Sequence, residues 1–78
     1  MEQITLDSGF HLTVTTLNKI KRGAWFTLKP YEEPNEMQVL IRGDYDRATK
    51  SFSCYYFGDV NHERFLKASR KVYTDFIF

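Results

Sequence analysis

Apolar and polar residues alternate with a period of two through much of the chain. In residues 10–16 an aromatic or aliphatic side chain is followed each time by a polar one, which places one set against a core and the other toward water. Residues 7–9, Asp-Ser-Gly, supply a side-chain cap and a glycine that accepts a positive φ. We therefore expect residues 4–5 to pair back on residues 10–14 as a hairpin.

A second hairpin is predicted in the middle of the chain. Residues 37–45 and 51–57 both alternate, and the polar residues 46–50 between them form a turn. In the first strand the odd-numbered residues are expected to share one face. In the return strand the even-numbered residues are expected to face the core.

Two further strands follow from the same pattern. Residues 24–29 place Trp25 among the polar, outward residues, and residues 72–78 form a closing apolar strand that we expect to be paired inside the sheet. Between the strands, residues 17–23 form a connecting turn. Residues 30–36 hold both prolines and are expected to form the longest loop.

These elements describe one small domain that spans residues 1–78. A short helical turn is predicted over residues 62–67, because Asp59 or Asn61 can cap its start. Five or six short strands, closely spaced turns and one helical turn indicate a mainly β fold. We expect a strongly bent antiparallel sheet or a small SH3-like barrel.

Composition limits the function classes. The 78 residues are 42% hydrophobic and 17% aromatic, which is enough for one core but near the lower size limit of a stable domain. A partner or a second copy would supplement such a core. Eleven Lys and Arg against ten Asp and Glu leave a net charge of +1, so no global field draws the chain to nucleic acid or to an anionic membrane.

The chain has the features of a cytoplasmic protein. Its one cysteine, Cys54, cannot form an intramolecular disulfide, whereas small secreted domains usually depend on several. Residues 1–16 lack a basic start followed by an apolar run, and no stretch approaches the roughly 18 residues of a membrane span. We expect a soluble, unprocessed protein with no membrane partner.

The sequence predicts no catalytic or metal-binding constellation. Cys54 lies in mid-strand, where a small buried side chain is usual. His11 and His62 stand outside any metal-ligand spacing, and the four glycines stand singly, so no phosphate-binding loop is present. The expectation is a protein that is not an enzyme and has no cofactor or metal.

Aromatic and basic residues provide the candidate binding site. Its members are Lys19, Lys21, Arg22, Trp25, Tyr31, Tyr55 and Tyr73. The three cations form a basic turn next to the predicted outward Trp25, with the tyrosines expected nearby. Stacking on such rings contributes about 1–3 kcal/mol per base in single-strand binders. The alternative is that the aromatics fill a small core from both sides of a bent sheet.

Several runs in the second half of the chain carry a resemblance. They are residues 42–47, 50–54, 59–67 and 72–78. Within residues 20–78 these runs resemble short uncharacterised proteins carried by mobile elements of Bacteroides-type gut bacteria. The resemblance implies a cytoplasmic accessory or regulatory protein of an integrated element, and it implies no activity, ligand or catalytic residue.

Two functions remain open from the sequence. The leading hypothesis is a non-enzymatic interaction module that docks a protein partner or a second copy through an exposed edge or aromatic face. Its basis is the surplus of aromatic residues without a catalytic constellation. The alternative is a weak single-stranded nucleic-acid binder that uses Trp25 and residues 19–22.

Overall fold

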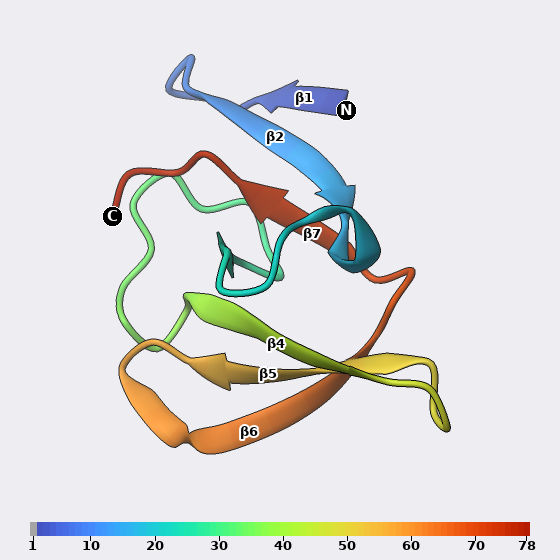
Figure 1. The fold of residues 1–78 in the computed structure, drawn as a ribbon. Helices are drawn as coiled ribbons and strands as arrows, with labels where there is room; N and C mark the ends of the chain where they lie inside the picture. The colour runs from blue at the N-terminus through green and yellow to red at the C-terminus, as the bar shows by residue number, and fades with distance from the viewer. Residues whose placement is uncertain (1) are drawn as a thin grey trace.

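The computed structural model describes residues 2–78 and contains seven strands in two antiparallel sheets (Figure 1). The strands are β1 (Glu2–Thr5), β2 (His11–Thr16), β3 (Trp25–Phe26), β4 (Leu40–Asp46), β5 (Ser51–Tyr56), β6 (Asp59–Lys67) and β7 (Lys71–Thr74). The 3-10 helix η1 (Leu17–Lys19) follows β2. One sheet has the order β1-β2-β7 and the other β3-β4-β5-β6. The predicted mainly β class is confirmed, with seven strands rather than five or six.

The predicted pairing of the first hairpin is confirmed, but Thr13 and Thr15, which were expected to face water, are 6% and 8% exposed in β2, the central strand of its sheet. β1 and β2 pair so that Ile4 lies opposite Leu12. The backbone N–H of Gly9 donates to the carbonyl of Leu6, and the N–H of Leu6 donates to the carbonyl of Phe10, both at 2.8 Å. Gly9 has a φ of 89°, which explains why a residue without a Cβ occupies this place in the loop.

A single bridge joins the two sheets. Thr27 follows β3 and exchanges two backbone hydrogen bonds of 3.0 Å with Tyr73 of β7. The N–H of Leu17, after β2, also donates to the carbonyl of Arg70, before β7. Because Thr27 and Tyr73 form an isolated bridge, the backbone pairing between the two sheets is short. Residues 2–78 form two separate sheets and no closed barrel is detected among them, so neither the single bent sheet nor the SH3-like barrel expected from the sequence is seen.

The main core lies between the two sheets, as the even-numbered residues of β5 predict. Phe52 is 4% exposed and Cys54 is fully buried, whereas Ser53 between them faces outward. The core consists of Leu17, Phe26, Leu40, Phe52, Cys54, Leu66 and Val72. Full burial of a large apolar side chain stabilises the fold by about 1.5–3 kcal/mol. Seven such residues are a small core, in keeping with the length of the chain.

A β-bulge in β4 changes the predicted alternation. Its register with β5 shifts between Arg42 and Tyr45, so that Tyr45 lies opposite the inward Phe52, with 5.0 Å between ring centroids. The extra residue of a bulge reverses which face the following side chains occupy. The prediction that the odd-numbered residues of this strand share one face is therefore wrong beyond Arg42. The guanidinium of Arg42 lies 4.0 Å from the centroid of Phe52 and covers that ring.

The predicted helical turn at residues 62–67 is wrong. These residues belong to β6, which pairs with β5 and lies at the free edge of the four-stranded sheet (Figure 1). Leu66 is 6% exposed and Phe65 is 59% exposed, as expected for neighbouring residues of a strand. Backbone hydrogen bonds to β5 take the place of the helical hydrogen bonds that a cap at Asp59 or Asn61 was expected to begin. The helical element of the described chain is instead η1, within the predicted connecting turn.

The closing strand is shorter than predicted. β7 ends at Thr74 because Asp75 adopts a left-handed backbone with φ of 66°. The three residues after Asp75 leave the sheet, and the N–H of Ile77 donates to the carbonyl of Glu32 in the long loop, at 2.8 Å. That loop, predicted over residues 30–36, contains no strand.

We predict that Gly43→Ala destabilises the protein. A Cβ at Gly43 would clash with the backbone oxygen of Ser53 across the bulge, so one of the two strands would have to move. The expected decrease in the free energy of unfolding is about 1–3 kcal/mol, measured by urea denaturation. The control is Asp44→Ala, an exposed neighbour that should cost less than about 1 kcal/mol. Equal stability of Gly43→Ala and the wild type would contradict the close approach of β4 and β5.

Candidate interaction surface

Four aromatic residues gather outside the main core, and we name them the outer aromatic cluster. They are Trp25, Phe57, Phe76 and Phe78. The ring centroids of Trp25 lie 5.3 Å from Phe57 and 5.4 Å from Phe78, and those of Phe57 and Phe78 are 4.9 Å apart. All three pairs are edge-to-face, an arrangement that adds about 0.5–1.5 kcal/mol per pair beyond burial. Phe76 joins at 6.4 Å from Phe78.

Sheet register brings the cluster together. Trp25 lies opposite Ile41 in β4, and since Phe26 belongs to the core, Trp25 points to the opposite, outer face of the sheet. Phe57 follows β5, and its N–H donates to the carbonyl of Val39 at 2.9 Å. Val39 is fully buried although it lies outside the main core. This burial indicates that part of the outer face is covered by side chains.

The cluster nevertheless remains accessible. Trp25 and Phe78 are each 45% exposed and Phe57 is 36% exposed. Three large aromatic side chains in mutual contact at the surface form an apolar patch, and such patches mark interaction sites more often than single exposed residues do. The prediction that Trp25 lies on the outer face is confirmed.

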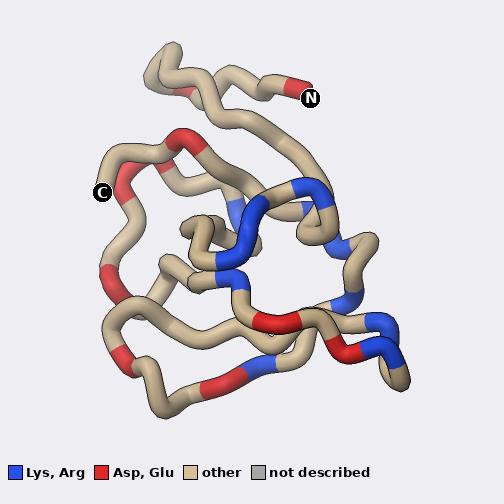
Figure 2. Tube along the Cα trace, in the orientation of Figure 1, with Lys and Arg blue, Asp and Glu red and all other residues tan. Residues whose placement is uncertain are grey.

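An open groove of about 400 Å³ borders the cluster. Trp25 and Phe76 line it together with Lys19 and Lys21, so the structure brings these two predicted cations to the predicted tryptophan. Figure 2 shows the cations following one another along the connection between η1 and β3. Asp75 also lines the groove and offsets part of their charge.

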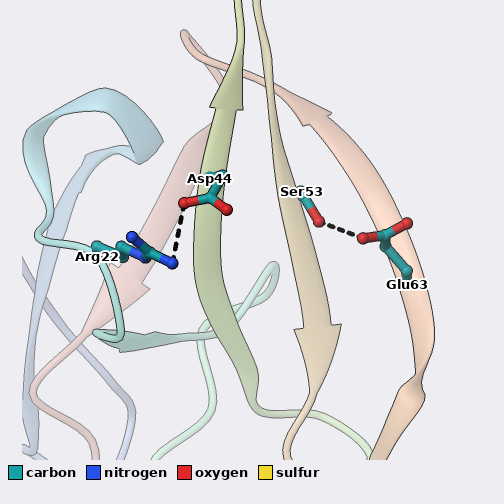
Figure 3. Close-up of polar contacts among 4 residues, drawn as sticks. All are labelled: Arg22, Asp44, Ser53 and Glu63. Atoms are coloured by element: carbon teal, nitrogen blue, oxygen red, sulfur yellow. Dashed lines mark hydrogen bonds and ion pairs between the residues drawn. The ribbon is translucent and has the colours of Figure 1, made fainter.

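Arg22 does not line the groove and pairs instead with an acidic residue. Its Nη2 lies 3.1 Å from Oδ1 of Asp44, and both side chains are more than 70% exposed, at 73% and 72% (Figure 3). An exposed pair of this kind contributes about 0–1 kcal/mol. Figure 3 also shows a second polar contact, in which Ser53 Oγ of β5 donates to Oε2 of Glu63 in β6.

The three candidate tyrosines do not join the groove. Tyr31 lines a separate hollow with Met37 and Tyr56. Tyr55 lies on β5 opposite Ile41, one strand further from Trp25. Tyr73 belongs to the other sheet, where it pairs with Val14. The candidate site of seven residues is thus reduced to Lys19, Lys21 and Trp25.

Sequence reasoning missed the other members of the cluster. Phe57 was expected to point outward, which was a usable signal, but Phe76 and Phe78 were expected inside the sheet. The left-handed backbone of Asp75 redirects them, and the alternation of residues 72–78 contains no sign of it.

Within residues 2–78 there is no group of three or more His, Cys, Asp or Glu residues that could hold a metal ion. His62 packs edge-on against Tyr56 at 4.9 Å between ring centroids, and Asp59 accepts the N–H of Asn61 at 3.2 Å. These contacts give both side chains structural partners.

Burial raises the pKa of the Cys54 thiol above its usual value of 9.0. A backbone hydrogen bond from Gly43 and the positive charges of Arg42 and Arg64 act in the opposite direction but are weaker. A raised pKa keeps the sulfur in its protonated, poorly nucleophilic form at neutral pH.

Comparison with known protein families, curated proteins and solved structures gave no match. No helix within residues 2–78 is long and apolar enough to cross a membrane.

We predict that Cys54 makes stability fall with alkaline pH. Since its pKa is higher in the folded than in the unfolded chain, its contribution is complete below about pH 9 and decreases as pH rises toward the folded pKa. Chemical denaturation of wild type and Cys54→Ala should therefore show a difference in unfolding free energy that is constant at neutral pH and changes above pH 9 in favour of the variant. A difference that stays constant up to pH 11, about two units above the usual value, would contradict a buried thiol.

Proposed function

We propose that this protein is a non-enzymatic interaction module that binds a protein partner through the outer aromatic cluster. The observation that carries the proposal is the edge-to-face contact of Trp25, Phe57 and Phe78 at the surface, with Trp25 and Phe78 each 45% exposed. Rings held rigidly by one another lose little conformational entropy on binding. Trp is also among the residues most enriched at the energetic centres of protein interfaces.

The surroundings of the cluster support a protein partner over a nucleic acid. Asp75 lines the same groove as Lys19 and Lys21, and Arg22 is paired with Asp44. The local charge is therefore mixed, which suits the polar rim of a protein interface. Affinity for a nucleic acid depends instead on several cations that are free to contact phosphates.

The remaining parts of the proposal come from the sequence. A cytoplasmic location is favoured by the single, buried and unpaired Cys54. The resemblance to proteins of mobile elements favours an accessory or regulatory role. We therefore propose a cytoplasmic adaptor whose activity consists of holding another protein.

We expect Trp25→Ala to abolish partner capture. The immobilised wild type, Trp25→Ala and the control Val60→Ser are incubated with extract of the native host, and retained proteins are quantified by mass spectrometry. Val60 is 62% exposed and lies outside the cluster. At least one protein should be retained by wild type and Val60→Ser and be reduced by about tenfold or more with Trp25→Ala, as for an interface hot spot.

Thermal melts of each variant separate loss of binding from loss of folding. If Trp25→Ala fails to fold, Phe78→Ser removes a different ring of the same surface. Retention of the same proteins by wild type and by folded variants of the cluster would contradict the proposal.

The second candidate is weak binding of single-stranded nucleic acid, favoured by the presence of Lys19, Lys21 and Trp25 in one groove. Under this function, stacking of bases should quench the emission of Trp25, the single tryptophan of the chain, and rising salt should reverse the quenching. The measurement is a fluorescence titration with short oligonucleotides at low salt. Unchanged emission at low salt would remove this candidate.

A further inference from the structure

The free edge of β6 is separate from the outer aromatic cluster and has its own binding pattern. β6 is the longest strand, it ends the order β3-β4-β5-β6, and eight of its nine residues are exposed. In Figure 1 it borders the four-stranded sheet with no described strand beyond it. An uncovered edge of this length presents backbone donors and acceptors to any strand that can align with it.

Hydrogen bonds elsewhere in the sheet identify which residues point their backbone outward. Alternate residues of an antiparallel strand direct their N–H and C=O groups to opposite sides. The N–H of Ala68 donates to the carbonyl of Lys50, on the β5 side, at 3.2 Å. Because every second residue directs its backbone to the same side, the N–H and C=O groups of Leu66 and Arg64 also face β5. The backbone N–H and C=O groups of Glu63, Phe65 and Lys67 therefore face the free edge.

The pairing between β4 and β5 leads to the same assignment of which β6 residues direct their backbone groups toward β5. The N–H of Phe57 donates to the carbonyl of Val39 in the strand segment before β4. Two residues earlier, Tyr55 therefore faces β4, and Cys54 faces β6. Cys54 lies opposite Arg64, which again directs Arg64 toward β5 and its neighbours outward.

The same three residues form a self-complementary series on the outer face. Phe65 is 59% exposed, and it has Glu63 two residues before it and Lys67 two residues after it. A second copy related by a two-fold axis through Phe65 would run antiparallel along this edge. Phe65 would then lie opposite itself, and Glu63 would lie opposite Lys67 of the second copy, twice. Each opposed pair would also exchange two backbone hydrogen bonds.

Other symmetric registers are less favourable. An axis through Glu63 places that carboxylate against its own copy, and an axis through Arg64 does the same with two guanidinium groups. The register centred on Phe65 is the one that combines outward backbone groups, an apolar centre and opposite charges on both flanks.

From this pattern we propose that the protein forms a two-fold symmetric dimer by antiparallel pairing of β6 with β6, centred on Phe65. The occupant of the edge is a second copy of this chain, and the dimer carries one continuous sheet across its axis. The proposal does not rest on the function of the outer aromatic cluster. Because only residues 63–67 pair, the interface is small, and the dimer is a weak one in rapid exchange with the monomer.

The test is a charge exchange measured by sedimentation velocity over a concentration series of the full chain. Glu63→Lys and Lys67→Glu each turn two opposite-charge pairs into like-charge pairs, and each should weaken dimerisation by about tenfold. The double variant, E63K with K67E, exchanges the charges and should restore dimerisation to within about threefold of wild type. Residues 63 and 67 are four apart on one strand, so they do not form an opposed pair within one chain.

Three results would overturn the proposal. They are a wild type that stays monomeric at about 1 mM, single variants that dimerise as well as wild type, and a double variant no better than the single ones. Phe65→Lys supplies a second check, since it opposes two cations on the axis and should abolish the dimer. Because Phe65 is exposed, circular dichroism should show that this variant is folded, and a folded Phe65→Lys that dimerises normally would also overturn the proposal.

Discussion

The reciprocal hydrogen bonds between Thr27 and Tyr73 hold the rest of the structure in place. They join a three-stranded and a four-stranded sheet that otherwise share few backbone contacts. The residues next to this bridge, Phe26 and Val72, are both fully buried. The bridge therefore sets the separation at which the two sheets enclose one core. In a chain of 78 residues, with a core of seven side chains, there is little else to define that separation.

Alternation predicted the elements that have one buried face and regular pairing. It succeeded for the pairing of the first hairpin and for Phe52 and Cys54 of β5, but Thr13 and Thr15 of β2, which were expected to face water, are buried. It failed in β4 because a bulge depends on the partner strand as well as on the local sequence. The helical turn expected at residues 62–67 was predicted from capping residues, and pairing along β5 outweighs those local signals.

The candidate site was predicted only in part, for a related reason. Lys19, Lys21 and Trp25 are close in sequence, so their proximity follows from local geometry. Phe57 and Phe78 reach Trp25 from β5 and from beyond β7, and such contacts require knowledge of the strand order. The tyrosines were grouped with the tryptophan by residue type alone, and the topology places Tyr55 and Tyr73 in different sheets and Tyr31 in a loop.

The left-handed turn at Asp75 has a consequence for how this chain can vary. Few side chains tolerate that backbone, and bulky β-branched residues tolerate it least. The turn sends Phe78 back over Trp25 without altering Val72, which is already seated in the core. A substitution that removes this turn would therefore rearrange the aromatic surface and leave the core residue Val72 in place.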